Sequence, residues 1–288
     1  MNKNYLPSIL FLAALWGSDF MFIKIGVSSI PPSIFTSFRF LIATITLFIY
    51  LKIKKENVKL DLKTYIFISF ISLIDVYLPQ ILISTGEKYV ASGITSLILS
   101  SSPIFTFIFA HIFLKDEKFN FIKLFFIMLG FSGVLIIFLK EIIHSDKFVF
   151  IGLILIILAS LFYGLGVILL KKISLKYSVL LSCFYLVFIS FLFSLPYSFS
   201  TKVTLDQIKI SSILSLFYVG IVLQSFAYTF FLNSIRKFGA SKTSFVGYLV
   251  PVFSVIYGVI FLNESININT LIGGAIIILS VYFIDKIK

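Results

Sequence analysis

The feature that most constrains this chain is a succession of apolar stretches, each about as long as a bilayer is thick. They cover residues 6–27, 32–51, 64–86, 91–114, 121–140, 149–170, 178–198, 210–234, 241–262 and 268–285. A helix needs ~20 apolar residues to cross the hydrocarbon core of a membrane. The chain is 59% hydrophobic and 12% charged, whereas soluble domains are about 45–50% apolar and about 25% charged. The sequence therefore predicts an all-α integral membrane protein with ten transmembrane helices.

The basic residues are concentrated in alternate loops. Groups such as Lys52–Lys55, Lys171–Lys172 and Arg236–Lys237 fall on one side of the predicted membrane, and few fall on the other. Because cytoplasmic loops carry the excess of Lys and Arg, we expect a multi-pass protein of the plasma (inner) membrane with both termini in the cytoplasm. The net charge of +12 would suggest a nucleic-acid partner for a soluble protein, but here these loops account for it. No nucleic-acid partner is predicted.

Two parts of the sequence occur twice, about half a chain apart. Trp16–Lys24 (WGSDFMFIK) matches Tyr163–Lys171 (YGLGVILLK), and Lys88–Glu117 resembles Lys237–Ser265. The second pair of segments shares an Ala-Ser pair, an apolar run with one proline, and an acidic residue near its end. Self-similarity of this kind indicates a duplicated structural unit.

The duplication predicts two units of five helices each, residues 1–145 and residues 146–288. Because five is odd, the second unit would enter the membrane from the opposite side to the first. The two units would then be inverted repeats, as in many secondary transporters.

A series of short segments carries a family likeness. They are WGSDF with Lys24, the Pro31–Pro32 turn, the Phe38–Arg39–Phe40 triplet, the two Ala-Ser…Pro…Glu segments and Gly130–Val134. In this order they resemble the EamA family of the drug/metabolite transporter superfamily, and the resemblance covers residues 5–285. It implies a ten-helix carrier that moves small metabolites, often amino acids, by alternating access. Asp19 departs from the pattern, because such proteins commonly have a neutral polar residue at that position.

Asp75 is one of two acidic residues predicted near the middle of the membrane. Tyr77 and Gln80 follow it, and in the second copy Gln224 corresponds to Asp75 and is followed one turn later by Tyr228. Ionisable groups inside a bilayer are costly and face a cavity or a partner, and repeat transporters place substrate and coupling-ion sites at this depth. We expect these residues to bind substrate, with Asp75 in either substrate binding or protonation. A structural hydrogen bond between helices is the alternative.

Asp19 is the other mid-membrane acid, and Trp16 precedes it by one helical turn. Tyr163 is the counterpart of Trp16, and we expect the pair to wall a pocket and stack on an apolar part or an ammonium group of the substrate. Tyr248, about one turn before Pro251, is expected to face the same cavity. The alternative is ordinary packing against lipid or helices, since the chain contains 36 Phe and 14 Tyr.

The remaining intramembrane charges are predicted to form two gates. Lys24 and Arg39 are expected near the outer surface with Glu264, and Lys171 and Glu117 near the inner one. Ion pairs in such clusters would break when the transporter changes state. Snorkelling of the long side chains to the membrane surface is the alternative.

Two prolines fall in the middle of predicted helices. Pro103 and Pro251 are expected to interrupt the fourth and ninth helices, because a mid-helix proline removes a backbone hydrogen bond and kinks the helix. We expect both kinks to act as gating elements.

The sequence contains no pattern that indicates an enzyme, a metal or a cofactor. Cys183 is the only cysteine and the two histidines are far apart, and no nucleotide-binding loop or hydrolase motif is present. We therefore expect a secondary active transporter of small polar metabolites, with amino acids or their derivatives preferred and nucleotide sugars or drug-like cations as alternatives. A membrane scaffold without flux is the alternative of a different class. The expected partners are a small-molecule substrate and the lipid bilayer, with a monomer as the functional unit and a dimer as the alternative.

Overall fold

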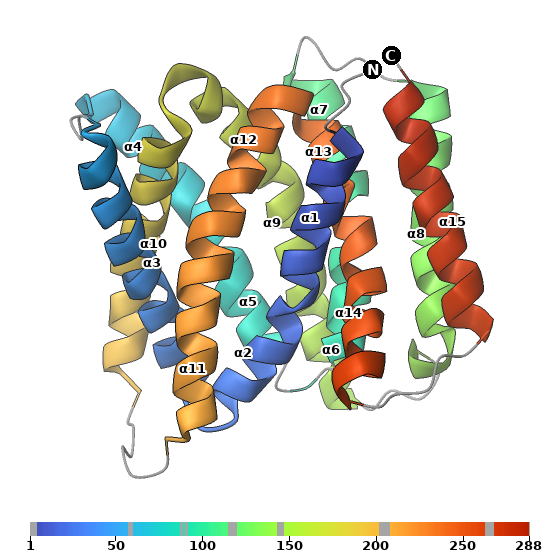
Figure 1. The fold of residues 1–288 in the computed structure, drawn as a ribbon, viewed down its shortest axis with the longest axis horizontal. Coiled ribbons are helices and arrows are strands. Elements are labelled where there is room, and N and C mark those ends of the chain that lie inside the picture. The colour runs from blue at the N-terminus through green and yellow to red at the C-terminus, as the bar shows by residue number, and fades with distance from the viewer. Residues whose placement is uncertain are drawn as a thin grey trace.

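The computed structural model describes residues 5–56, 60–86, 89, 92–114, 120–142, 147–201, 208–262 and 268–287, and within them it is helical with no strand. The first copy contains α1 (Tyr5–Gly17), α2 (Asp19–Val27), α3 (Pro32–Lys54), α4 (Leu62–Ile71), η1 (Ser72–Tyr77), α5 (Leu78–Gly86), α6 (Ser92–Leu99), α7 (Ser102–Phe113) and α8 (Phe121–Ile142). The second contains α9 (Lys147–Lys176), α10 (Val179–Phe199), α11 (Ile210–Tyr218), η3 (Val219–Ala227), α12 (Tyr228–Phe238), α13 (Ala240–Ser244), α14 (Val246–Leu262) and α15 (Ile268–Lys286). The prediction of an all-α chain is confirmed for this part. Figure 1 shows one bundle, in which α1 begins and α15 ends at the same end.

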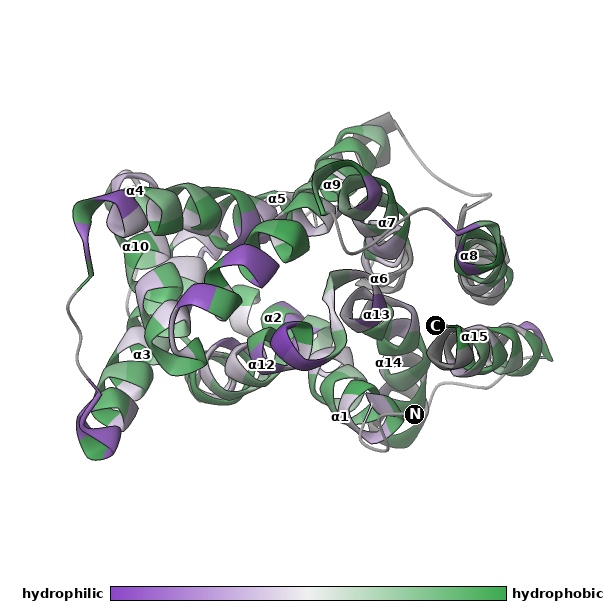
Figure 2. Ribbon diagram, turned by 90° about the horizontal axis from the view of Figure 1, so that it is seen from above, coloured by the Kyte–Doolittle hydropathy of each residue, from purple (hydrophilic) through white to green (hydrophobic). Residues whose placement is uncertain are grey.

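Six helical stretches of the described residues are long and apolar enough to cross a membrane. They are Tyr5–Val27, Pro32–Lys54, Leu62–Gly86, Phe150–Lys176, Val179–Phe199 and Ile210–Phe238. The other four predicted regions are helical as well, and three of them hold shorter apolar helices at Ser102–Phe113, Phe121–Gly133 and Leu271–Ser280. Large apolar side chains such as Ile53, Phe121 and Leu214 are exposed on the outside of the bundle, and hydrophobic residues predominate along the helices in Figure 2. Because so large an apolar surface requires lipid around it, the chain is a membrane protein.

The two copies use the same close contact between helices. A methyl group added at Gly17 in α1 would lie 2.6 Å from Phe253 Cβ in α14, and one added at Gly164 in α9 would overlap Phe105 Cβ in α7. Gly17 and Gly164 are counterparts in the aligned Trp16 and Tyr163 segments, and Phe105 and Phe253 both lie two residues after the repeated proline. Small residues let helix backbones approach closely in a membrane. The duplicated sequence therefore has a duplicated packing contact.

The repeated prolines lie beyond the helix breaks rather than at them. Pro103 is in the first turn of α7, where the missing N–H costs no helical hydrogen bond, and the break precedes it at Ser100 and Ser101. Pro251 lies inside the continuous helix α14, so the expectation that it interrupts the ninth helix is wrong. That helix breaks at Phe245, about one and a half turns earlier.

The two breaks are in contact with each other. The Ser100 hydroxyl shares its one proton between the Gly247 carbonyl oxygen, 3.0 Å from Oγ, and the Ser96 carbonyl oxygen, 2.8 Å from Oγ. The hydroxyl thus satisfies carbonyl groups of both copies next to the interruption, as a break inside a membrane requires.

Candidate functional site

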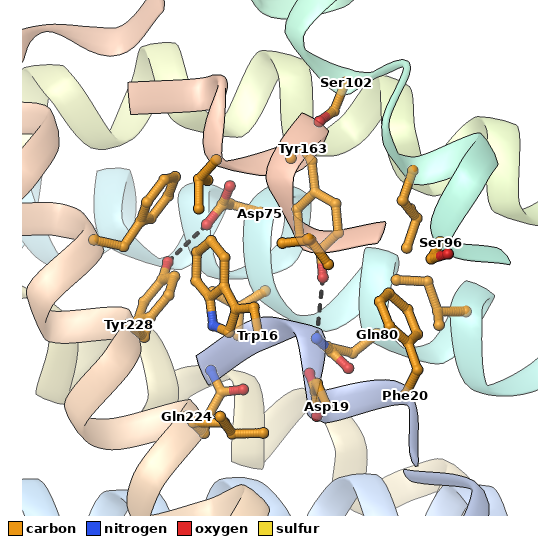
Figure 3. A pocket seen from close by; sticks show the side chains of 18 of the residues that line it. Trp16, Asp19, Phe20, Asp75, Gln80, Ser96, Ser102, Tyr163, Gln224 and Tyr228 are labelled. Carbon is orange, nitrogen blue, oxygen red and sulfur yellow. Dashed lines mark hydrogen bonds between the residues drawn. The ribbon is translucent and has the colours of Figure 1, made fainter. Parts of the chain in front are cut away.

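A cavity of about 150 Å³ lies between helices of both copies (Figure 3). Its polar lining consists of Asp19, Arg39, Asp75, Gln80, Ser96, Ser102, Tyr163, Gln224, Tyr228 and Ser244, and its apolar lining includes Trp16, Phe20, Ile23, Val76, Ile83, Leu99, Val167, Leu223, Phe231, Val246, Gly247 and Val250. Concave, mostly apolar walls with a few converging polar groups are typical of small-molecule sites. The structure brings together Trp16, Asp19, Asp75, Gln80, Tyr163, Gln224 and Tyr228 of the predicted substrate-binding residues.

A buried ion pair joins the first two predicted spans at this cavity. Arg39 Nη2 lies 3.1 Å from Asp19 Oδ2, and the Arg39 side chain is 4% exposed. Asp19 is the first residue of α2, where a carboxylate is stabilised by the positive end of the helix dipole. A buried charge needs a partner and further hydrogen bonds, and Asp19 and Arg39 supply the partner to each other.

Arg39 extends further, to both of the mid-span glutamines. Its Nη1 donates to Gln80 Oε1 at 3.1 Å and its Nε donates to Gln224 Oε1 at 3.0 Å. One guanidinium on α3 therefore links α2, α5 and η3. The expectation that Arg39 lies near the outer surface with Lys24 is wrong, because Arg39 lines the cavity whereas Lys24 is exposed on α2.

Asp75 lies on the opposite wall of the cavity. It is 3% exposed, and its Oδ2 accepts a hydrogen bond from the Tyr228 hydroxyl at 2.6 Å. Gly166 of α9 makes room for it, because a methyl group there would lie 2.6 Å from Asp75 Cβ and Cγ. Gly166 is the counterpart of Asp19 in the aligned Trp16 and Tyr163 segments.

The third and eighth predicted helices both contain a π-helical stretch at this depth. Asp75 lies in η1 and Gln224 lies in η3. π-helical turns are rare and occur frequently at functional sites. Each adds a residue to a helical turn, so the side chains that follow are rotated relative to a regular α-helix.

Aromatic side chains complete the walls. Gln80 Nε2 donates to the Tyr163 hydroxyl at 3.0 Å, so the network around Arg39 reaches α9. The Trp16 ring lies 4.8 Å from the Phe231 ring. Figure 3 shows Trp16, Tyr163 and Tyr228 around the same space as the two carboxyl groups.

Two predicted wall residues lie elsewhere. Tyr77 is not among the lining residues, and its ring is 6.2 Å from the Phe193 ring of α10. Tyr248 is fully buried, and its hydroxyl donates to the Ile127 carbonyl of α8 at 2.9 Å. These two expectations are wrong, because Tyr77 ends the π-helical stretch and Tyr248 follows the break at Phe245, where regular helical spacing does not apply.

The predicted gates remain largely predictions. Lys171 is buried in α9, and Pro103 and Pro251 are buried but do not line the cavity. Glu117 and Glu264 lie outside the described residues.

Several lining residues did not emerge from the sequence. At or near the two helix breaks lie Ser96, Ser102, Ser244 and Gly247. The Ser100–Ser102 triplet is a sequence signal for the break before α7. Phe20 and Ile23 follow Trp16 at the spacing of a single helix face, so that spacing was a signal for them.

A second polar cluster lies at the end of the bundle that holds both chain ends (Figure 1). Asp61 caps α4 by accepting a hydrogen bond from the Thr64 amide at 3.2 Å, and Oδ1 accepts from the Thr64 and Tyr177 hydroxyls at 2.6 Å each. These hydrogen bonds, first those of Thr64 and Tyr177, hold the pKa of Asp61 well below its ordinary value. In the same cluster, Lys176 Nζ donates to Thr64 Oγ1 at 3.1 Å. The cluster connects the beginning of α4 to the turn between α9 and α10.

No group of three or more His, Cys, Asp or Glu side chains in the described part of the chain is arranged to hold a metal ion.

Comparison with known proteins agrees with the duplicated helical fold. The EamA-like transporter family matches the chain twice, over residues 5–139 and 150–284. Uncharacterized transporter YoaV of Bacillus subtilis is 26% identical over 286 residues, which are 95% of this chain and 94% of that protein. An uncharacterized transporter of Archaeoglobus fulgidus is 27% identical, over 98% of this chain and 97% of its own. A solved crystal structure shares the fold with a TM-score of 0.80 at 12% identity, and the match covers 98% of this chain and 96% of that one.

Proposed function

Because the chain belongs to the EamA-like transporter family, we propose that it is a secondary active transporter of small polar metabolites, with amino acids or their derivatives as substrates. The observation that carries the substrate class is the cavity, in which a buried Asp19–Arg39 pair and Asp75 project between apolar and aromatic walls. A small solute with a charged end and an apolar side chain fits such a lining.

The proposed topology is ten transmembrane helices in two inverted five-helix units, residues 1–145 and 146–288. The protein would lie in the plasma (inner) membrane with both termini in the cytoplasm and would function as a monomer. The common end of α1 and α15 and the basic loops of the sequence support this arrangement.

The proposed mechanism is alternating access about the cavity. Both copies contribute walls to it, so a rocking motion of one copy against the other would open it to each side in turn. The Arg39 network joins α3 to η3 of the second copy, and we propose that it holds the copies together around the substrate.

Of the two alternative substrate classes, nucleotide sugars are less well matched by the lining residues. A nucleotide sugar carries several negative charges, whereas Arg39 is the one cationic side chain of the described lining and is already paired with Asp19. A drug-like cation would fit the carboxyl groups, and flux measurements must separate it from amino acids. A scaffold without flux would have no use for a cavity with buried charges.

Reconstitution tests the proposal directly. Purified protein in proteoliposomes should take up or release members of a labelled amino-acid panel faster than protein-free liposomes, and a pH gradient should alter the rate if protons are coupled. Nucleoside diphosphate sugars and quaternary ammonium compounds serve as comparison solutes. Absence of flux for every solute tested would contradict a transport function.

A further inference from the structure

The two oxygens of the Asp19 carboxylate are in different situations. Oδ2 is paired with Arg39, whereas Oδ1, which is also buried, accepts no hydrogen bond from any described residue. A buried acceptor without a donor is costly, and such groups in folded proteins call for an explanation. An N–H group of a ligand in the cavity would satisfy this oxygen.

Arg39 is less available to a substrate carboxylate than Asp19 Oδ1 is to a substrate N–H group. Its Nε, Nη1 and Nη2 atoms each donate to a protein acceptor, respectively Gln224, Gln80 and Asp19. Three of the five N–H groups of this guanidinium are thus used within the protein, and a substrate carboxylate would have to share it with Gln224, Gln80 and Asp19.

The charges of the cavity also favour a ligand with an ammonium group. Asp19 and Asp75 face a single guanidinium among the described lining residues, so an incoming cation is favoured over an incoming anion. The rings of Trp16, Tyr163 and Tyr228 line the same space, and aromatic faces attract an organic ammonium group.

We propose that the cavity recognises its substrate through an ammonium group bound to Asp19 Oδ1, and that a carboxylate on the substrate is not required. This inference rests on the proposed transport function and adds which chemical group of the substrate the protein recognises. It follows that monocationic derivatives, such as amides of amino acids, bind at least as well as the zwitterions.

An organic ammonium is a better match than a metal cation. Hard cations need several oxygen ligands around them, whereas Asp19 Oδ2 is already paired with the Arg39 guanidinium, and the described lining also includes apolar side chains such as Phe20 and Ile23.

Three ligands with one apolar side chain separate the alternatives. Leucine carries both charges, leucinamide carries only the ammonium, and 4-methylpentanoate carries only the carboxylate. Binding to the full-length protein in detergent is followed by the shift of the thermal unfolding midpoint, with potassium and sodium chloride as inorganic arms. Leucine and leucinamide should raise the midpoint at similar concentrations, and 4-methylpentanoate should not.

Substitutions at the ion pair locate the effect. Asp19→Glu should keep the response to both amines. Asp19→Asn leaves Arg39 unpaired and risks misfolding, so the Asp19→Asn/Arg39→Gln variant, which neutralises both partners, carries the test. Its half-saturating concentration for leucinamide should rise about tenfold or more, since a hydrogen bond to a charged group is lost. Asp61→Asn, the same change outside the cavity, is the matched control and should respond as the natural protein does.

Three results would overturn the inference. The first is that 4-methylpentanoate raises the unfolding midpoint as much as leucinamide does. The second is that the Asp19→Asn/Arg39→Gln variant responds to leucinamide as strongly as the natural protein. The third is that sodium chloride raises the midpoint and the amines raise it no further. If the amines fail while another solute is carried in proteoliposomes, the ammonium site is refuted and the transport function stands. If no solute is carried at all, the proposed function itself fails.

Discussion

Both copies contribute to the walls of the cavity, with corresponding backbones but different chemistry. In the first copy Asp19 is a charged residue at the break between α1 and α2, and in the second its counterpart Gly166 has no side chain. Asp75 of the first copy occupies the space over Gly166. Its counterpart Gln224, also in a π-helical stretch, contacts Arg39 instead.

The difference shows how a duplicated fold acquires a binding site whose charged residues come from one copy. Arg39 has Leu186 or Val187 at the corresponding position of the second copy, depending on the register, and both are buried and apolar. The packing contacts at Gly17 and Gly164 are equivalent, whereas the charged residues of the described cavity lining all belong to the first copy. The repeat therefore accounts for the frame of the cavity, and the departures from it account for its polarity.

Arg39→Leu should have the largest effect. It removes the difference between the copies at this position, because the counterpart of Arg39 in the second copy is the apolar Leu186 or Val187. It leaves Asp19 buried without its cationic partner, so we expect the free energy of unfolding to fall by about 3–5 kcal/mol and transport to be lost. Thermal unfolding in detergent and flux in proteoliposomes measure the two effects. The Asp19→Asn/Arg39→Gln variant should recover most of the stability, and an unchanged midpoint for Arg39→Leu would refute the role of the pair.

Asp75→Asn makes the two π-helical stretches alike, with an amide in each. The substitution keeps the size of the side chain and an oxygen that can accept from Tyr228, so the protein should fold and insert normally. We expect flux in proteoliposomes to fall by about tenfold or more, since the loss of one charged interaction is of that size. Flux equal to that of the natural protein would rule out a functional role of the carboxylate.

Gly17→Ala and Gly164→Ala test the part of the comparison that should be symmetric. Each methyl group would meet a phenylalanine Cβ, of Phe253 or of Phe105. Overpacking of this kind costs about 1–3 kcal/mol, so both variants should unfold at lower temperature by similar amounts. Gly274→Ala, with no atom within 4 Å of the added methyl, is the control. A large effect at only one of the two glycines would show that the copies do not pack equivalently.

Asp61→Ala should have the smallest effect and sharpens the contrast between the exposed cluster and the buried site. It removes the cap of α4 and the acceptor of the Tyr177 hydroxyl, so the unfolding midpoint should decrease slightly. Because hydrogen bonds lower the pKa of Asp61 below its ordinary 3.8, its contribution is fully present above that pH and is lost as the pH falls through the lowered pKa.

The midpoints of the natural protein and of Asp61→Ala should therefore differ by a constant amount at roughly neutral pH and converge in acid. Asp61→Asn retains a side chain that caps helices well and should lose less. A difference that grew as the pH was lowered would have the wrong sign for this explanation.

Much of the site could be predicted from residue types and spacing. Asp19, Asp75 and Gln224 were expected in the cavity because polar groups inside a membrane need a cavity or a partner, and Trp16 and Tyr163 because they align in the repeat. Tyr77 and Tyr248 were misplaced, since helical spacing predicts a face only while the helix stays regular. An extra residue in a helical turn rotates all later side chains by about 100°.

The sequence by itself determined the helical membrane fold and the duplication, because these depend on hydrophobic length and on self-similarity along the chain. Only the tertiary structure decided that Arg39 would pair with Asp19 rather than join Lys24, and that Asp19 Oδ1 would be left without a donor. The reason is that the partner of a long buried side chain depends on how helices distant in sequence are rotated and packed against one another. That rotation is a property of the whole bundle and not of any one segment.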